Sequence, residues 1–208
     1  MRLGKSVLLG FGILWLIAVG AGLWVLFHYE TSPGEAARPP VQWPAESEIP
    51  RAPGRATLVM VAHPHCPCTR ASIGELALLM ARLQGQVPAY VLFLKPTGVA
   101  EDWPKTDLWR SSAAIPGVTV MGDEGGVEAA RFRATVSGQT FLYDVNGRLL
   151  FSGGITASRG HSGGNAGRSA IVHLVTKGVA ERTQTSVFGC SLHDPNPRAR
   201  QVDRSWKR

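Results

Sequence analysis

The chain has 208 residues, of which 44% are hydrophobic and 18% are charged. This length suits one globular domain of ordinary size with appendages, and it excludes two full domains with separate cores. The formal net charge is +7 at pH 7. Part of the excess lies in a basic tail, which is expected to be solvated and able to contact anionic lipid headgroups. Its cations are Arg198, Arg200, Arg204, Lys207 and Arg208.

The first feature along the chain is an apolar run, residues 7–27, that contains no charged side chain. A helix of this length crosses about 30 Å of hydrocarbon. A cleaved signal peptide is the alternative, but its apolar region normally has about 7–15 residues and ends at a small-x-small site. This run is longer and ends in bulky side chains, so we expect a transmembrane helix over residues 6–28.

The charges that flank this run predict its orientation. Arg2 and Lys5 precede it, whereas Glu30 and Glu35 follow it. Because basic residues tend to stay on the cytoplasmic side, residues 1–5 are expected in the cytoplasm. The rest of the chain is then expected outside the inner (cytoplasmic) membrane, in the periplasm or extracytoplasmic space. Nucleic acid is not an expected partner there.

Residues 29–55 form a proline-rich segment. This density of proline disfavours regular helix and favours an extended, semi-rigid chain. We expect a linker that holds the domain away from the membrane. Its prolines are Pro33, Pro39, Pro40, Pro44, Pro50 and Pro53.

The domain begins with a pattern typical of a βαβ unit. Residues 57–62 are a continuous apolar, β-branched run, as in a strand buried on both faces. Apolar residues then recur at helical spacing from Ile73 to Leu83, and Gly85 supplies a stop. Residues 89–94 repeat the buried-strand pattern, so the two strands should be parallel.

An antiparallel hairpin is the clearest feature of the second half. Asn146-Gly147 is the dipeptide that best tolerates the positive φ angles of a two-residue turn, and it joins two apolar runs. Asn165 is placed to cap the last helix. In chain order, the elements expected after the βαβ unit are helical residues 102–111, a strand at 118–121, a helix at 127–134, strands at 139–145 and 148–152, and a helix at 168–176.

The order of these elements resembles that of the thioredoxin-like superfamily. The stretch Leu-Val-Met-Val-Ala-His-Pro-His-Cys-Pro-Cys leads from a strand into a helix, where that superfamily places its reactive cysteines. Phe-Leu-Tyr-Asp-Val-Asn-Gly-Arg similarly resembles the hairpin of its membrane-tethered members. The Cys-Pro-Cys segment, the glycine-rich loop at 153–167 and the late Cys190 are most similar to the group called RedB-type proteins. The resemblance covers about residues 56–178. It implies an α/β thioredoxin-like fold, a central mixed β-sheet flanked by helices, over residues 56–180, with a tail at 181–208.

The candidate reactive groups are Cys66 and Cys68, at the expected helix N-terminus. Unpaired backbone N–H groups and the helix dipole favour the thiolate there, and Pro67 suits the first helical position. His63 and His65 would add positive charge when protonated and lower the thiol pKa further. The interpretation is a thiol–disulfide oxidoreductase with Cys66 as nucleophile and Cys68 as resolving thiol. It needs no cofactor and acts on protein thiols or disulfides, or on a redox partner.

Two departures from thioredoxins bear on this chemistry. Thioredoxins have two residues between the cysteines and this chain has one, so a disulfide between Cys66 and Cys68 would close a smaller, more easily reduced ring. Thioredoxins also place a cis-proline opposite the cysteines, whereas residues 136–139 contain none. The second departure argues against the usual thioredoxin mode of substrate binding.

Metal binding is the rival interpretation. His63, His65, Cys66 and Cys68 are ligands that copper or zinc accept. His161 lies in the glycine-rich loop, which either brings it beside the cysteines or is a simple surface turn. Alternating positions of a strand cannot all converge on one ion, so a set such as His65, Cys66 and Cys68 with His161 fits better. A third interpretation is a structural disulfide on a non-catalytic thioredoxin-like scaffold.

Cys190 lies in an apolar island, residues 187–192, within a polar tail. Exported cysteines usually pair. Three roles stay open for it: a disulfide with Cys66 or Cys68, a resolving thiol, or a buried free thiol.

Overall fold

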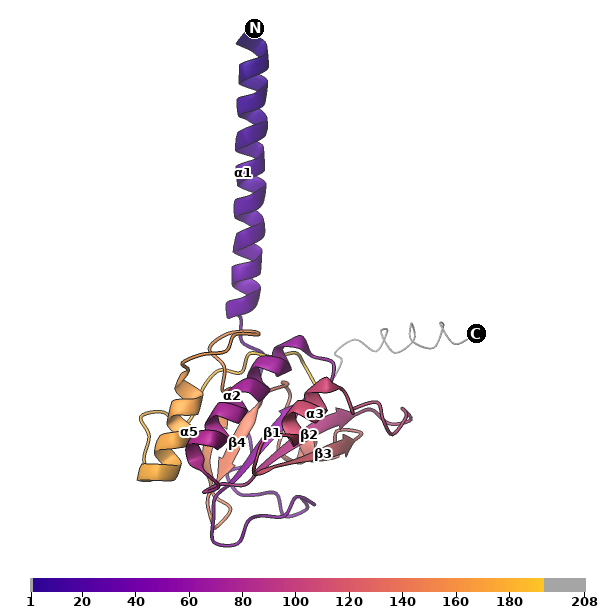
Figure 1. Cartoon of the computed structure of the whole chain (residues 1–208), viewed down its shortest axis with the longest axis vertical. Helices are drawn as coiled ribbons and strands as arrows, with labels where there is room; N and C mark the ends of the chain where they lie inside the picture. Colours follow the sequence, from indigo (N-terminus) through magenta and orange to yellow (C-terminus); the bar gives the residue numbers. More distant parts are fainter. Residues whose placement is uncertain (1, 193–208) are drawn as a thin grey trace. The chain divides into compact units, whose positions relative to one another are not determined.

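The computed structural model describes residues 2–192, without the side chains of residues 2, 3, 5 and 6. The chain divides into two compact units between Ser32 and Pro33. Figure 1 shows the long helix of the first unit and the sheet with its helices in the second. The basic cluster at residues 198–208 lies outside the described residues.

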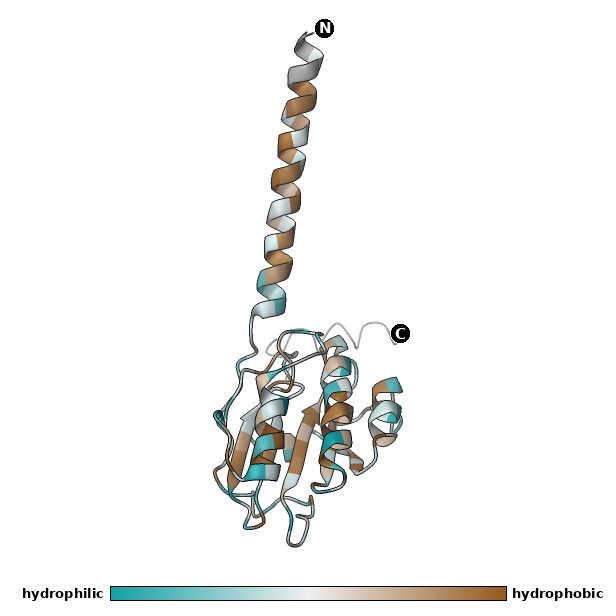
Figure 2. Ribbon diagram, turned by 60° about the vertical axis from the view of Figure 1, so that its left-hand side comes forward, coloured by the Kyte–Doolittle hydropathy of each residue, from teal (hydrophilic) through white to brown (hydrophobic). Residues whose placement is uncertain are grey.

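The first unit is the helix α1, Arg2–Thr31. Its segment Val7–Thr31 has a mean hydropathy of 2.2 and is long enough to cross a membrane. Large apolar side chains along it are exposed, for example Phe11 and Trp15, and Figure 2 shows hydrophobic residues over most of its length. An exposed apolar surface of this extent suits lipid better than water. The helix is therefore consistent with a transmembrane anchor.

A five-stranded mixed sheet forms the centre of the second unit, with the strand order β3-β2-β1-β4-β5. β1 pairs in parallel with β2, and β2 with β3, whereas β4 runs antiparallel to both β1 and β5. The expected fold class, a mixed sheet flanked by helices after one N-terminal apolar helix, is confirmed. The elements are β1 (Thr57–Ala62), α2 (Pro67–Leu83), β2 (Ala89–Lys95), α3 (Asp107–Ala113), β3 (Val118–Glu124), α4 (Val127–Arg131), β4 (Thr140–Tyr143), β5 (Leu149–Gly153) and α5 (Ala166–Lys177).

The sheet buries both of its faces, as the unbroken apolar runs predicted. Successive side chains of a strand point to opposite faces, so Leu58 and Met60 of β1 join one core and Val59 and Val61 the other. The first face packs against α2, α3 and α5, which lie together in Figure 1. The second face packs against α4. This layering brings the N-terminus of α2 to the carboxyl end of β1.

Three element boundaries of the second unit differ from the expected ones by three residues or more. α3 begins at Asp107 rather than near residue 102, because the chain around Pro104 forms turns. β3 continues to Glu124, since its parallel pairing follows β2 as far as Lys95. α4 ends at Arg131, earlier than expected.

The turn between β4 and β5 also differs from the expected two-residue turn. Gly147 has a positive φ of 79°, but Asn146 does not. The carboxylate of Asp144 accepts hydrogen bonds from the backbone N–H groups of Asn146 and Arg148, both at 2.8 Å. This side-chain contact stabilises a turn in which only the glycine needs the left-handed region.

After the end of α1, the proline-rich segment forms no helix, and it packs along the second unit. Ile49 is 2% exposed and belongs to the core on the second face of the sheet. The Trp43 ring packs edge-on against Phe132 and Tyr143, at centroid distances of 5.1 and 5.2 Å. Burial of these apolar side chains fixes the segment on the domain. The structural unit therefore begins well before the expected boundary at residue 56.

Replacing Ile49→Ala should lower the free energy of unfolding of the second unit by about 2–4 kcal/mol, because it leaves a cavity in the core. Urea unfolding of the full chain in detergent, followed by tryptophan fluorescence, measures this change. Val41 lies in the same segment and is 74% exposed, so Val41→Ala should change the free energy by no more than about 0.5 kcal/mol. Equally small effects of both variants would mean that the segment does not pack on the domain.

Candidate active site

The cysteine segment lies at the junction between β1 and α2, as the sequence predicted. Cys66 is the N-cap residue of α2, with an extended backbone (φ −85°, ψ 120°), and Pro67 opens the helix. The Cys66 N–H donates to the His63 carbonyl at 3.2 Å, which closes the loop before the helix. Both Cys66 and Cys68 are buried. The junction therefore places two thiols at the positive end of a 17-residue helix.

Cys190 joins these two thiols from the far end of the chain. The sulfur atoms of Cys66, Cys68 and Cys190 all lie within 4.8 Å of one another, and all three are free thiols. The Sγ atoms of Cys66 and Cys190 are 2.6 Å apart, compared with about 2.05 Å in a disulfide. A small movement would therefore let this pair bond.

Hydrogen bonds to Cys66 favour its thiolate. They lower the pKa of Cys66 from 9.0 to about 4, and the largest contribution comes from the Cys190 side chain. The Cys190 backbone and both the hydroxyl and backbone of Thr69 contribute further, while burial opposes them. Among the three thiols of the cluster, Cys66 is the one whose surroundings favour the thiolate, the reactive form of a cysteine.

The other two thiols are held in their neutral form. Burial and the charge of Cys66 raise the pKa of Cys68. The pKa of Cys190 is raised chiefly by the hydrogen bond between its thiol and Cys66, with burial as the second cause. Two adjacent thiolates would repel each other, so the reduced cluster carries its charge on Cys66.

The structure does not bring the candidate histidine ligands to the sulfur cluster. Among the described residues, the cluster of possible metal ligands contains the three cysteines and no histidine. The rings of His63 and His65 pack against Trp103, with centroid distances of 5.9 and 4.6 Å. His161 is exposed, and its Nδ1 lies 3.0 Å from the Arg159 carbonyl. Burial lowers the pKa of His63 from 6.5, which favours the neutral form of this ring.

Ser137 occupies the region opposite the cysteines where the sequence showed no proline. Its hydroxyl accepts a hydrogen bond from the His63 N–H at 2.8 Å and lies 2.7 Å from the Thr69 hydroxyl. Its backbone N–H donates to the Cys190 carbonyl at 2.8 Å. Ser137 thus ties together the three segments that carry the site. The missing proline marked this region in the sequence, but nothing in the sequence identified the serine as its centre.

Arg159 is a further site residue that the sequence did not identify. Its guanidinium hydrogen-bonds Cys68 and donates to the Gly189 carbonyl. The loop that carries Arg159 is anchored by Glu75 of α2, which is 0% exposed. The Glu75 carboxylate accepts hydrogen bonds from the Asn165 side chain at 3.0 Å and from Arg168 of α5. A buried ion pair therefore positions the loop beside the thiols.

Replacing Cys190→Ala should raise the pKa of Cys66, because the variant loses the largest hydrogen bond to the thiolate. Alkylation of Cys66 follows its thiolate fraction, so the midpoint of the rate against pH should move upward from about 4. Below the new midpoint the rate falls by about tenfold per pH unit. Iodoacetamide labelling of the reduced full chain, read by mass spectrometry, measures the profile. An unchanged midpoint would mean that Cys190 does not stabilise the thiolate.

No protein-family model and no curated protein matches the chain. Among solved structures, an uncharacterized conserved protein from Geobacillus kaustophilus is similar, with 20% identity and a TM-score of 0.56 over 80% of this chain and 94% of the other. A hypothetical protein from Sinorhizobium meliloti 1021 has 22% identity and a TM-score of 0.54, over 77% of this chain and 93% of the other. A secreted disulfide oxidoreductase of Mycobacterium tuberculosis, homologous to DsbE of Escherichia coli, has 15% identity and a TM-score of 0.42, over 59% of this chain and 81% of the other.

The first two likenesses concern the fold alone. Each similarity extends over more of the chain than the expected domain at residues 56–180. The common fold therefore includes segments that flank this range. The strand order and the position of the cysteines agree with the resemblance seen in the sequence. The second unit of this chain therefore has a thioredoxin-like fold.

Proposed function

We propose that the protein is a membrane-anchored thiol–disulfide oxidoreductase with Cys66 as its nucleophile. The observation that carries this proposal is the meeting of three sulfur atoms within 4.8 Å at the N-terminus of α2. In this proposal Cys66, whose pKa is lowered, supplies the attacking thiolate, and Cys68 or Cys190 resolves the mixed disulfide. On its motifs we also assign the chain to the RedB-type group.

The proposed reaction transfers two electrons in two exchange steps. The Cys66 thiolate attacks one sulfur of a substrate disulfide, a mixed disulfide forms, and the second substrate sulfur leaves as a thiolate that takes up a proton. Cys68 or Cys190 then loses its proton and attacks the Cys66 sulfur. This step releases the first substrate sulfur as a thiolate and leaves the chain oxidised. In reverse, the oxidised chain accepts two electrons from a substrate dithiol.

The electrostatics of the cluster favour the reverse direction. A thiolate that is stabilised in the reduced protein makes the corresponding disulfide a stronger oxidant. The low pKa of Cys66 has this effect. We therefore propose that the chain oxidises or isomerises protein thiols, and that it does so outside the cytoplasmic membrane, with the N-terminus of α1 in the cytoplasm.

Two measurements on the full chain in lipid nanodiscs test this function. The oxidised chain should accelerate the recovery of activity by reduced, unfolded ribonuclease. In glutathione buffers its reduction potential should lie above the value of about −270 mV for thioredoxin. A potential at or below that value would refute the oxidising direction, and no acceleration would refute the exchange activity. A periplasmic reporter enzyme fused to the C-terminus should be active if the orientation is right.

Copper or zinc binding is the second candidate, and the same sulfur cluster favours it, because thiolates suit soft and borderline ions. The geometry changes the expected ligand set from cysteines and histidines to three cysteines. Competition titration with copper(I) or zinc distinguishes the cases. Tight, stoichiometric binding that is lost with Cys190→Ser and kept with His161→Ala would support a metal site. Weak binding of copper(I) and zinc to the unaltered chain would exclude a metal site.

A further inference from the structure

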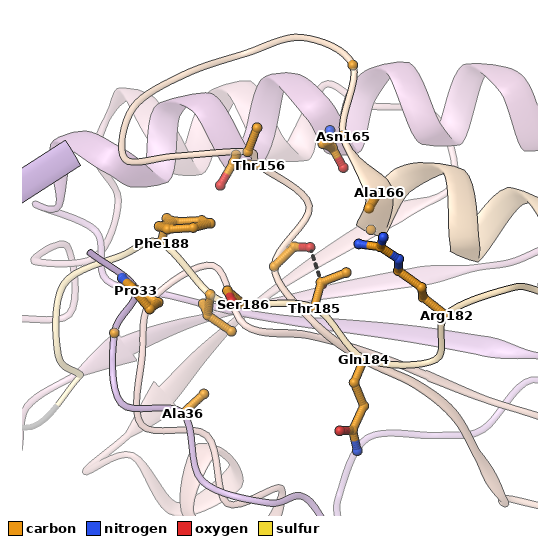
Figure 3. A pocket seen from close by; sticks show the side chains of 16 residues that line it. Pro33, Ala36, Thr156, Asn165, Ala166, Arg182, Gln184, Thr185, Ser186 and Phe188 are labelled. Atoms are coloured by element: carbon orange, nitrogen blue, oxygen red, sulfur yellow. Dashed lines mark hydrogen bonds between the residues drawn. The ribbon is translucent and has the colours of Figure 1, made fainter. Parts of the chain in front are cut away.

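Residues 183–192 cross the second unit as an extended segment held by hydrogen bonds. The Ser152 N–H of β5 donates to the Thr183 carbonyl at 3.0 Å, and the Thr185 N–H donates back to the Ser152 carbonyl at 3.3 Å. The Thr185 hydroxyl also donates to the Gly154 carbonyl at 2.8 Å, the dashed line in Figure 3, where the segment lines a cavity of about 710 Å³. The segment thus extends the edge of the sheet.

The end of this segment pairs antiparallel with the chain just before β4. The Ser137 N–H donates to the Cys190 carbonyl at 2.8 Å, and the Leu192 N–H donates to the Thr135 carbonyl at 2.9 Å. This pairing delivers the Cys190 sulfur to within 2.6 Å of the Cys66 sulfur. A peptide that binds as an added strand derives its affinity from main-chain hydrogen bonds of this kind. The arrangement is that of an extended peptide presenting a cysteine to a nucleophile.

The side chains around Cys190 fit their surroundings as a bound peptide would. Val187 and Leu192 are 1% and 4% exposed, so an apolar residue is buried on each side of the cysteine. Gly189 lies so close to Ser137 that a Cβ added to the glycine would be 1.9 Å from the Ser137 carbonyl oxygen. The position before the cysteine therefore accepts only glycine in this conformation.

We propose that residues 135–137 form a docking strand for extended, cysteine-containing polypeptides, and that residues 187–192 of the chain itself are its resident occupant. The inference rests on the proposed function and defines its substrate class: an unfolded or extended segment with glycine before the cysteine and apolar residues nearby. A cavity of about 620 Å³ beside the docking strand, lined in part by Thr135, Val136 and Gly189, offers space for the flanking residues of such a substrate.

A substrate reaches the docking strand when the resident segment leaves. In the oxidised chain with a disulfide between Cys66 and Cys190, the Cys68 thiolate attacks the Cys66 sulfur. A bond forms between Cys66 and Cys68, the bond to Cys190 breaks, and Cys190 leaves as a thiolate that takes up the proton lost by Cys68. No electrons are gained or lost overall. Arg159 hydrogen-bonds Cys68 and holds the carbonyl of Gly189, so its cation is placed beside the attacking and the leaving sulfur.

Gly189→Ala in the full chain tests the proposal without altering a thiol, because the new Cβ would clash with Ser137 and undock the segment. The matched control is Gly122→Ala, since an added Cβ there meets nothing within 4 Å. The probe is the peptide Val-Phe-Gly-Cys-Ser-Leu, whose cysteine carries thionitrobenzoate as a leaving group. Attack by Cys66 on the peptide sulfur releases this group, whose absorbance gives the rate. Each rate is divided by the rate with Ellman's disulfide, which reports the reactivity of Cys66 without a peptide.

A tethered segment competes at an effective concentration in the millimolar range. With peptide at roughly 0.1 mM, the rate ratio should therefore rise at least about tenfold in Gly189→Ala and stay unchanged in Gly122→Ala. A peptide with alanine in place of its glycine should react at least about tenfold more slowly than the original with every protein, because it cannot approach Ser137. This second comparison needs no altered chain, and it decides the matter if Gly189→Ala fails to fold. The docking strand would be refuted if Gly189→Ala had the same rate ratio as the unaltered chain and the two peptides reacted at the same rate.

Hydrogen–deuterium exchange separates this inference from the proposed function. The Ser137 amide should be protected in the unaltered chain, exchange rapidly in Gly189→Ala, and regain protection when a peptide with serine in place of its cysteine is added. Protection that does not depend on residue 189 would contradict docking even if Cys66 is reactive. Failure of Cys66 to react with Ellman's disulfide would refute the thiol–disulfide exchange function. The hydrogen–deuterium exchange of the Ser137 amide would still show whether the segment docks.

Discussion

Replacing Cys66→Ser is expected to lower the rate of thiol–disulfide exchange by at least about a hundredfold, because the thiolate is the attacking species and a serine hydroxyl stays protonated at neutral pH. Cys66 is the one thiol of the three whose surroundings favour its charged form. Recovery of activity by reduced ribonuclease, with the full chain in nanodiscs, measures the loss. Retention of most of the activity in Cys66→Ser would remove the nucleophile assignment.

Cys68→Ser and Cys190→Ser are the matched controls, because both residues lie beside Cys66 but are held in their neutral form. Each variant should still form the mixed disulfide with substrate, since the first attack does not need a resolving thiol. The variant that accumulates this species on a non-reducing gel identifies the residue that resolves it. Absence of a mixed disulfide in both variants would count against the two-step reaction.

Replacing Arg168→Met should lower the free energy of unfolding by about 3 kcal/mol, because it leaves the carboxylate of Glu75 buried without its cation. The Glu75 side chain is 0% exposed, whereas that of Arg168 is 24% exposed. The hydrogen bonds that Glu75 accepts from the Gly163 N–H and the Asn165 side chain do not involve Arg168, so they do not replace the missing cation. Urea unfolding of the full chain measures the stability.

The ion pair between Arg70 and Asp107 provides the control for this variant. Its side chains are 66% and 53% exposed, and exposed pairs contribute about 0–1 kcal/mol. Arg70→Met should therefore leave the unfolding midpoint almost unchanged. A similar loss in both variants would mean that burial of Glu75 does not determine the cost.

Local patterns in the sequence predicted most of the fold. The buried run at 57–62, the helical spacing after Pro67 and the run at 89–94 each contain their own signal, because hydrophobic periodicity reflects burial directly. Asn165 was expected to cap the last helix, and its side chain accepts from the Arg168 N–H at 2.8 Å. The same local reasoning placed Cys66 and Cys68 at the helix N-terminus.

Long-range packing could not be predicted in the same way. The prolines between residues 31 and 53 indicated that this segment forms no helix, but the side of the sheet on which Ile49 is buried depends on contacts that no local pattern encodes. The same holds for Cys190, which approaches Cys66 across 124 positions of sequence. The sequence alone did not mark Gly189, because the close approach that requires a glycine is made to Ser137, a residue distant in the chain.

The measurement that tests the account most directly is the alkylation rate of each cysteine against pH, in the reduced full chain, by mass spectrometry. Cys66 is expected to react fastest and to remain reactive well below pH 6, while Cys68 and Cys190 react only at alkaline pH. An unreactive Cys66 in the folded protein, or a Cys66 that reacts no earlier than the other two, would contradict the assignment of the nucleophile.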